Sequence, residues 1–425
     1  MQIPKKSICI ISFSPIYRDA RVLRQIKYLS PYYDLTVIGY GHPHPSWLHM
    51  PNVRWISIDY SMEPIHKKDR LEGMGTLERF IGGRLTRFLR SSLRPKAIAE
   101  YLVMFLGRFH PSLYEVWFWR KTQHAQALKH AAENGFDAIL ANDWNALPVA
   151  AEAAKKSNAR LVFDAHEYAP LELENRCYWR ILFQSMIIYF LKKYVPQVSA
   201  SLTVAPLISE RYSQEFNLSP IVVLNVPEKI TLPDRELELG NIRLIHHGGA
   251  VRDRRLEEMI RTIGYCDQRF HLHFMLLNTD NQYLARLRKL ASEVAGGRVT
   301  FHEPVPPEEI VQRISEYDMG FYLLDPNSYN NRVALPNKFF DFIAAGLAVC
   351  IGPSPSMAEM VVRYGLGCVA PTFKPHDVAD MLNNLTKQEI LKMRLASREA
   401  SKKINAEIEM GKLIDLCNRT LGSSR

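Results

Sequence analysis

The chain repeats a short apolar run followed by a longer amphipathic segment over most of its 425 residues. In the first half, continuous apolar runs predict strands, and apolar residues spaced three or four apart predict helices. The predicted strands are Ser7–Phe13, Leu35–Gly39, Val53–Ser57, Ala138–Ala141, Leu161–Asp164 and Ser201–Val204, and the helices are Asp19–Leu29, Leu147–Lys155 and Ile181–Tyr194. Alternation of this kind predicts an α/β domain built on a parallel, doubly wound sheet.

The same alternation starts again after a connecting strand at Ile221–Leu224 and a polar segment at Pro227–Gly240. The second set of predicted strands is Leu244–His246, His271–Leu277, Val299–Phe301 and Gly320–Leu323, with helices at Leu256–Thr262, Tyr283–Glu293 and Glu308–Glu316. We therefore expect two Rossmann-like domains, residues 1–205 and 206–400, facing each other across a cleft. The polar stretch 396–421 predicts a helical tail, and we expect residues 401–425 to pack back on the first domain.

Residues 335–352, with the sequence LPNKFFDFIAAGLAVCIG, form a candidate ligand-binding segment. It predicts a helix capped by Asn337 and ended by Gly346, followed by a buried strand. The start of such a helix presents unpaired N–H groups and a positive dipole end, which together favour an anion. Lys338 adds a full positive charge there, and Asp341, one turn further on, could accept hydrogen bonds from two sugar hydroxyls.

The loop after the predicted strand Leu244–His246, HGGAVRDRR, combines two glycines with several arginines. Gly248 and Gly249 allow the backbone to approach a ligand closely. Arg254 stands just before the next helix, where a guanidinium can clamp a diphosphate with two hydrogen bonds. The alternative is a solvated turn whose arginines pair with neighbouring carboxylates.

Polar residues follow three of the predicted strands in the first half. Ligands of parallel α/β sheets bind outside the carboxyl ends of the strands, so these residues are candidates for a binding site. The polar residues after these strands are Asp19 and Arg21, Asp143 and Trp144, and His166 and Glu167. His166 can donate or accept a proton near neutral pH, and Glu167 could orient it. Asp19 could equally serve only as the N-cap of the first helix. The first loop lacks the GxGxxG pattern, which argues against a dinucleotide-dependent dehydrogenase.

The formal net charge of +10 is concentrated in one part of the chain. Residues 64–130 hold thirteen Lys and Arg against five Asp and Glu, mixed with Leu, Phe and Trp. This composition predicts a basic helical insertion and suits an anionic membrane surface. The alternative is a solvated face beside an ordinary buried helix. No recognised motif supports a nucleic-acid partner, so we expect none.

Several other classes of protein are disfavoured by what the sequence does not contain. No apolar run approaches the ~18 residues that a membrane-spanning helix needs. The six cysteines form no CxxC pair, which favours reduced thiols in a cytoplasmic protein. No Asp-x-Asp pair and no HExxH motif is present, and we predict no metal site and no cofactor.

These motifs together resemble the retaining glycosyltransferases of the GT-B fold, in the large family of sucrose-, mannosyl- and lipopolysaccharide-type transferases. The stretch LPNKFFDFIAAGLAV is similar to the nucleotide-binding helix of that family, and the resemblance implies that Asp341 binds ribose. HGGAVRDRRLEEMI resembles its phosphate loop, with Arg254 at the basic position, and FDAHEY makes His166 the counterpart of its active-site histidine. The chain departs from the family at Val333, where an acidic residue is usual. Arg332, Asn337 and Lys338 are the neighbours that could replace it.

The resemblance implies transfer of a sugar from a nucleotide diphosphate sugar to a hydroxyl acceptor, with retention and without a metal. The expected catalytic residues are His166, Arg254 and Lys338; the donor-binding residues are Gly248, Gly249, Arg332, Asn337 and Asp341; the acceptor-side residues are Asp19, Arg21, Asp143 and Trp144. We expect a glycan or lipid-linked acceptor and a cytoplasmic protein, peripheral on the inner membrane face. Two alternatives stay open: a nucleotide-sugar epimerase of the same fold, and a non-catalytic partner subunit.

Overall fold

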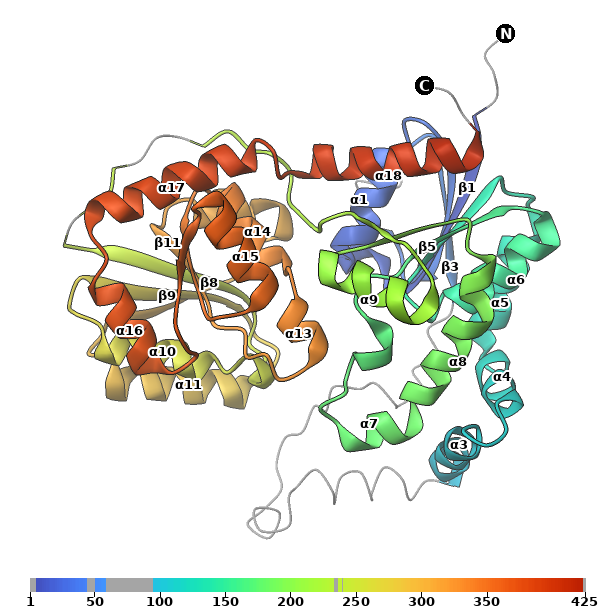
Figure 1. Cartoon of the computed structure of the whole chain (residues 1–425), viewed down its shortest axis with the longest axis horizontal. Coiled ribbons are helices and arrows are strands. Elements are labelled where there is room, and N and C mark those ends of the chain that lie inside the picture. The colour runs from blue at the N-terminus through green and yellow to red at the C-terminus, as the bar shows by residue number, and fades with distance from the viewer. Residues whose placement is uncertain (1–4, 44–49, 59–94, 233–235, 239, 423–425) are drawn as a thin grey trace. The chain divides into compact units, whose positions relative to one another are not determined.

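The structure of the protein is a computed structural model that describes all residues except 1–4, 44–49, 59–94, 233–235, 239 and 423–425. The described chain divides into two compact units. The first unit comprises residues 1–202, 211–221 and 414–425, and the second comprises residues 203–210 and 222–413. Each unit is built around its own sheet (Figure 1).

The first sheet has seven strands among the described residues, in the spatial order β3-β2-β1-β4-β5-β6-β7. These strands are β1 (Ser7–Pro15), β2 (Asp34–Tyr40), β3 (Val53–Ile58), β4 (Ala138–Asn142), β5 (Arg160–Asp164), β6 (Ala200–Thr203) and β7 (Ile221–Val222). The strand order reverses between β1 and β4, which pair in parallel, and the ends of such strands are where ligands bind in this architecture.

The helices of the first half join these strands and cover both faces of the sheet. They are α1 (Ala20–Leu29), α3 (Pro95–Leu106), α4 (Ser112–Trp119), α5 (Thr122–Glu133), α6 (Leu147–Ser157), α7 (Cys177–Leu182), α8 (Gln184–Tyr194) and α9 (Pro206–Phe216). Helices α5, α6 and α8 pack side by side over one face, whereas α1 lies on the other (Figure 1). The predicted strands of this sheet are confirmed. The apolar runs of β1, β2, β4 and β5 are buried on both faces, whereas β3, at the sheet edge, is partly exposed.

The second sheet has six strands among the described residues, all paired in parallel, in the order β10-β9-β8-β11-β12-β13. Its strands are β8 (Ile242–Gly249), β9 (Phe270–Leu277), β10 (Val299–His302), β11 (Met319–Tyr322), β12 (Ala348–Ile351) and β13 (Gly367–Val369). The order reverses between β8 and β11. The two sheets with their covering helices confirm the predicted α/β fold with two Rossmann-like domains.

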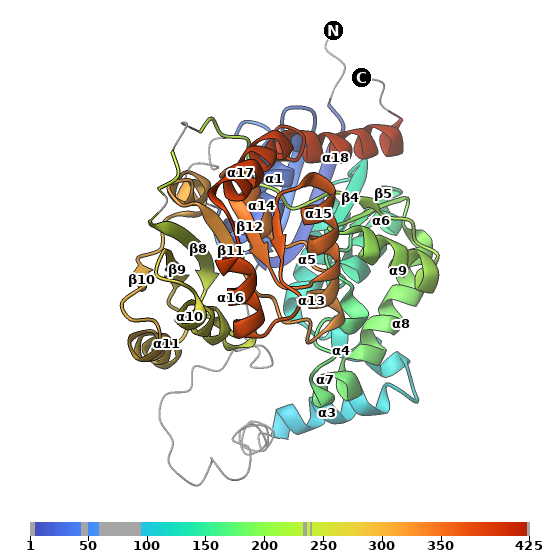
Figure 2. The ribbon, with the colours of Figure 1, turned by 60° about the vertical axis from the view of Figure 1, so that its left-hand side comes forward.

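The helices of the second half are α10 (Leu256–Tyr265), α11 (Asn281–Val294), α12 (Ile310–Ile314), α13 (Tyr329–Val333), α14 (Asn337–Ala344), α15 (Pro355–Tyr364), α16 (Pro375–Asn383), α17 (Lys387–Ser401) and α18 (Ala406–Leu421). Helix α14 packs against β11, β12 and α17, as Figure 2 shows from a second direction. Its apolar residues Phe339, Phe340, Phe342 and Ile343 are buried, and Gly346, at φ +67°, ends it as predicted.

Helix α14 approaches the sheet closely at one glycine. A Cβ atom added to Gly320, in the middle of β11, would overlap the ring of Phe342 on α14. A side chain at this position would therefore push the helix away from the sheet. The absence of a side chain at Gly320 therefore lets α14 lie close to β11 at Phe342.

Three local predictions are wrong, each because tertiary contacts override the local pattern. The predicted helix 181–194 breaks at Phe183 into α7 and α8, where the ring of Phe183 is buried. Asn337 does not cap α14: Pro336 is the N-cap, and the side chain of Asn337 is exposed. The stretch 396–421, which we expected to be one polar helical tail, belongs to two helices, and α18 buries Met410, Leu413 and Cys417.

The predicted basic insertion at 64–130 is described only from residue 95 onward, so the arginine-rich part at 84–94 lies outside the described residues. Its described part is helical, in α3, α4 and α5. Large apolar side chains on these helices are exposed, and they are Leu102, Phe105, Leu106 and Val116, with Phe109 in the following turn. In the part of the chain that the structure describes, no helix combines the length and hydrophobicity that crossing a bilayer requires.

We expect replacement of Gly320 by alanine to destabilise the second unit by about 1–3 kcal/mol, because the new methyl group collides with the Phe342 ring. Urea unfolding measures this loss as a lower midpoint. Gly411 is the matched control, since it lies inside α18 with open space at its Cβ position. Gly411→Ala should leave stability unchanged or raise it slightly, because alanine favours a helix. Equal midpoints for Gly320→Ala and the wild type would contradict this packing argument.

Candidate active site

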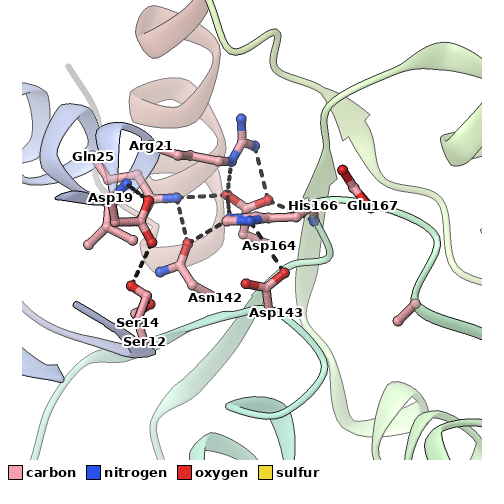
Figure 3. Close-up of polar contacts among 12 residues, drawn as sticks. Ser12, Ser14, Asp19, Arg21, Gln25, Asn142, Asp143, Asp164, His166 and Glu167 are labelled. Carbon is pink, nitrogen blue, oxygen red and sulfur yellow. Dashed lines mark hydrogen bonds and ion pairs between the residues drawn. The ribbon is translucent and has the colours of Figure 1, made fainter. Parts of the chain in front are cut away.

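The first cluster of polar residues lies at the ends of β4 and β5 and at the start of α1 (Figure 3). Asp164, the last residue of β5, is fully buried at its centre. The guanidinium of Arg21 donates two hydrogen bonds to this carboxylate, at 2.6 Å from Nε and 2.9 Å from Nη2. Gln25 donates to the same carboxylate at 2.7 Å and to the Asn142 side-chain oxygen at 2.9 Å. Helix α1 is thereby fixed to the ends of two strands.

His166 lies two residues after the end of β5 and is held by residues at the ends of β4 and β5. Its Nδ1 lies 3.3 Å from Asp143 Oδ1, and its Nε2 lies 3.2 Å from Asn142 Oδ1 and 3.5 Å from Asp164 Oδ2. Burial lowers the pKa of His166, but the Asp143 and Asp164 carboxylates outweigh it and raise the pKa to about 9. His166 is therefore an imidazolium at neutral pH, better suited to donate hydrogen bonds than to act as a base.

The backbone at this cluster adopts an uncommon conformation. Asp143 and His166 both have positive φ, at 66° and 49°; Asp143 directly follows β4, and Ala165 separates His166 from the end of β5. Left-handed backbone at residues other than glycine costs free energy and occurs most often where function requires it. The ends of β4 and β5 thus place the Asp143 carboxylate and the His166 imidazolium next to each other.

The remaining candidates of the first half have more local roles in this structure. Both carboxylate oxygens of Asp19 are engaged, one by the backbone N–H of Val22 and the other by the Ser14 hydroxyl at 2.6 Å, so it is the N-cap of α1. The prediction that Glu167 orients His166 is wrong, because Asp143, Asn142 and Asp164 hold that ring. The side chain of Glu167 is exposed instead. Trp144 is half-buried, and its side chain donates a hydrogen bond to Glu172.

The second cluster lies at the carboxyl end of β8 and brings three of the predicted residues together. Gly248 has φ +117°, and the point where its Cβ would stand is 3.2 Å from Lys338 Nζ and 3.3 Å from Arg254 Nη1. Lys338 comes from the first turn of α14, and Arg254 comes from the single turn Arg252–Arg254 before α10. Gly249 lies apart from the two cations, next to Val251 and Thr279.

Lys338 is an unusual residue in this cluster because its ammonium group is buried. Its Nζ has no hydrogen-bond partner among the described residues and lies 4.6 Å from the centre of the Tyr322 ring. Burial, and then the neighbouring Arg254, hold the pKa of Lys338 well below its usual range, while Asp341 opposes this shift. An anion placed beside Gly248 would supply the missing partner to both cations.

Asp341 stands one helical turn after Lys338, beside a histidine that the sequence did not single out. His247 Nε2 lies 3.4 Å from Asp341 Oδ2. Burial, followed by Lys338 and Arg254, lowers the pKa of His247 to about 3, so its ring is neutral. The only sequence signal for this residue was its place directly before the glycine pair.

The other predicted donor residues lie on two helices: Arg332 is on α13, and Asn337 is the first residue of α14. Arg332 is exposed on α13, whereas Val333 is buried in the core, so an acidic residue at this position would need a partner. The described residues contain no group of three or more His, Cys, Asp or Glu side chains placed to hold a metal ion. Outside these clusters, His273 Nδ1 on β9 contacts His302 Nε2 on β10 at 2.9 Å.

No family model matches the sequence, and no curated protein matches it. Solved structures do resemble it. HepE from Anabaena, solved with UDP and glucose, superposes with a TM-score of 0.63 at 14% identity, covering 97% of this chain and all 100% of that chain. Sucrose-phosphate synthase from Thermosynechococcus elongatus gives 0.64 at 13% identity, with coverage of 99% and 100%. The trehalose 6-phosphate synthase from Burkholderia multivorans gives 0.62 at 9% identity, with coverage of 99% and 100%.

The chain has the GT-B fold. The superpositions extend over both units and cover the neighbours completely, and the neighbours are GT-B glycosyltransferases. In this GT-B chain, the His166 cluster and the Arg254–Lys338 cluster each lie beside the point where the strand order of their sheet reverses.

We expect the stability of the first unit to depend on pH through His166. Its pKa in the folded chain, about 9, is above the ordinary value of 6.5. The stabilisation is therefore complete below pH 6.5 and is lost as pH rises through 9, by at most about 3 kcal/mol. Urea unfolding between pH 6 and 9.5 measures the slope. His166→Gln should flatten it, whereas His110→Gln, on an exposed turn, should not. A wild-type midpoint independent of pH would contradict the assignment.

Proposed function

We propose that this chain is a glycosyltransferase that moves a sugar from a nucleotide diphosphate sugar to a hydroxyl acceptor. The observation that carries the proposal is the meeting of Arg254 and Lys338 against Gly248 at the carboxyl edge of a parallel sheet. Two cations beside a backbone without a side chain suit the charge and shape of a diphosphate. The HepE structures, which contain UDP, UDP with glucose, or UDP-glucose, support the same class of ligand.

In the proposed reaction, the bond between the anomeric carbon and the leaving phosphate oxygen breaks while the acceptor oxygen bonds to the same carbon. The acceptor proton passes to the leaving phosphate, and the anomeric configuration is retained, as the sequence resemblance implies. Arg254 and Lys338 stabilise the charge that develops on the phosphate. A fixed contact of this kind is worth roughly 3–4 kcal/mol in other enzymes, and our proposal assigns no step to a metal.

The first unit supplies the acceptor-side residues in this proposal. His166, as an imidazolium, donates a hydrogen bond to a hydroxyl of the sugar or acceptor, and Asp143 accepts one. Trp144 offers an aromatic surface at the same strand end. Arg21 and Asp19 act as positioning residues, because Arg21 holds Asp164 and Asp19 caps α1.

We expect nucleoside diphosphates to stabilise the chain in a thermal-shift screen of UDP, GDP, ADP and dTDP, because a ligand that binds only the folded state raises its melting temperature. Arg254→Ala should abolish the shift and reduce sugar transfer by about 10²–10³-fold, since it removes one of two diphosphate contacts. Arg252→Ala is the matched control, because Arg252 is in the same turn and bonds Asp280 at 2.8 Å. It should retain binding and transfer within a few fold.

The outcomes of this screen separate the alternatives. A chain that no nucleoside diphosphate stabilises, or an Arg254→Ala variant with normal transfer, contradicts the proposal. A chain that binds donor without transferring it would instead be a non-catalytic partner. Conversion of the donor alone into an epimerised nucleotide sugar would identify an epimerase.

We further propose that the acceptor is lipid-linked or a polysaccharide, and that the chain is a cytoplasmic protein bound to an anionic membrane surface. The support is the charge of residues 64–130 together with the exposed apolar side chains of α3 and the turn after it. Phe105 and Phe109 are 42% and 69% exposed, with their rings 6.0 Å apart, and Arg108 stands exposed between them. Aromatic side chains flanked by cations favour the headgroup region of anionic bilayers.

We expect the chain to float with vesicles of phosphatidylcholine and phosphatidylglycerol at low salt and less with phosphatidylcholine alone, since the charged part of the attraction is screened by salt. The double variant Phe105→Ser/Phe109→Ser should lose this binding. Val362→Ser is the control, because Val362 is 76% exposed on α15, outside the basic segment. Flotation of the double variant at the wild-type level, or none for the wild type, would contradict the membrane proposal and leave the nucleotide proposal standing.

A further inference from the structure

Arg255 has a backbone conformation that glycine adopts more readily than arginine. It lies between the turn Arg252–Arg254 and helix α10, with φ 47° and ψ 50°, in the left-handed region. A residue with a side chain loses free energy in this region, whereas glycine does not. Arg255 is also the N-cap of α10, yet its side chain makes no capping hydrogen bond. Local structure therefore does not explain an arginine at this position.

The side chain of Arg255 joins two neighbouring loops. Its Nη1 donates a hydrogen bond to Asp325 Oδ2 at 2.8 Å, and its Nη2 donates one to Glu258 Oε1 at 3.4 Å. Arg255 lies in the connection after β8, and Asp325 lies in the loop after β11. These two strands pair in parallel where the strand order of the second sheet reverses. The ion pair therefore connects the two loops that border a position where such sheets bind ligands.

The contribution of this ion pair to stability is too small to account for the arginine. The side chains of Arg255 and Asp325 are 53% and 26% exposed, and water screens an exposed ion pair so that it contributes little. The left-handed backbone of Arg255 costs at least as much free energy as the ion pair supplies. Strained residues of this kind occur most often at functional sites.

The loop that carries Asp325 is itself held in place. The carbonyl oxygen of Asp325 accepts a hydrogen bond from Asn331 Nδ2 at 3.4 Å, and Ser328 caps the helix α13 that contains Asn331. The preceding carbonyl, of Leu324, accepts a hydrogen bond from the buried Ser354 hydroxyl at 3.3 Å. Asp325 therefore gives Arg255 a fixed partner.

We propose that the ion pair between Arg255 and Asp325 holds the neighbouring Arg254 in the orientation that binds the diphosphate, which makes Arg255 a positioning residue. The inference rests on the proposed function, in which Arg254 and Lys338 contact the diphosphate beside Gly248. Arg254 points toward Gly248, whereas Arg255 points toward Asp325. Fixing Arg255 limits the conformations open to the residue before it, so less freedom is lost when the diphosphate binds.

The other end of the same turn has a contact of the same kind on the other side of β8. Arg252 donates a hydrogen bond to Asp280, the N-cap of α11, at 2.8 Å. The loop of Asp280 follows β9, and β9 and β11 flank β8 on opposite sides. Arg252 is therefore a matched comparison, because its ion pair does not border the position between β8 and β11.

The test measures the binding of UDP, GDP, ADP, dTDP and inorganic pyrophosphate to the full chain by calorimetry, together with its unfolding in urea. Arg255→Gly removes the side chain and permits the left-handed backbone without strain. We expect this variant to bind the preferred nucleoside diphosphate and pyrophosphate about threefold to tenfold more weakly, which is the effect of having to order one long side chain on binding. Its urea midpoint should equal or exceed that of the wild type.

Three further variants test whether the ion pair is the cause. Asp325→Asn should weaken binding as much as Arg255→Gly, and the double variant should be no weaker than either, since both changes remove the same contact. Arg255→Lys keeps a cation near Asp325 and should retain most of the affinity. Arg252→Ala should bind within about twofold of the wild type, because an exposed ion pair elsewhere in the turn contributes little.

Three results would overturn the inference. If Arg255→Gly binds as tightly as the wild type, the ion pair does not position Arg254. If Arg252→Ala weakens binding as strongly, the effect belongs to the whole turn. If Arg255→Gly lowers the urea midpoint and Arg255→Lys does not restore binding, Arg255 has only a structural role. Failure of the wild type to bind any nucleoside diphosphate is a different result, because it overturns the proposed function and this inference with it.

Discussion

A buried ammonium beside a guanidinium is the constraint on which the second unit depends. Lys338 and Arg254 repel each other, and Lys338 has lost its hydration, so placing the two side chains together is unfavourable in the absence of an anion. The surroundings keep the two together nonetheless. Gly248 leaves room for both, Gly320 lets α14 approach the sheet, and the face of Tyr322 partly replaces water for Lys338. The sheet end is therefore organised before any ligand arrives, which reduces the free-energy cost of ordering it on binding.

The polar cluster of the first unit has balanced charges, in contrast to the two neighbouring cations of the second unit. In this cluster Arg21 pairs with Asp164, and His166 pairs with Asp143. Gln25 donates hydrogen bonds to Asp164 and Asn142. Such a balanced, buried network holds a rigid geometry but has little surplus charge for capturing an anion. The contrast in charge balance suits the two tasks that we propose, in which the second unit binds a charged donor and the first binds neutral hydroxyls through one imidazolium and one carboxylate.

The sequence was sufficient for features that depend on local composition. Strands β1 and β4 follow from continuous apolar runs, the cap at Asp19 from a polar residue before an amphipathic helix, and the end of α14 from Gly346. Prediction from the sequence failed where the local structure depends on contacts with residues that are distant in the chain. The break at Phe183 depends on where that ring is buried, and the orientation of His166 depends on Asn142 and Asp164, which lie on two strands. The approach of His247 to Asp341 joins β8 to α14 across nearly a hundred residues, and no periodic pattern records it.

The low identity to the solved neighbours shows which parts of the chain the fold constrains. Strand order and the burial of both sheet faces can be met by many apolar sequences, so these features persist while nearly every side chain changes. The residues that follow the strands are not constrained in this way, because their side chains do not form the core. Val333 shows the difference: it lies next to the exposed Arg332 on α13, yet it is buried, so packing determines which residue types fit there. Lys338 is the reverse case, since its burial opposes its charge, and our proposal explains that residue type there by a bound anion.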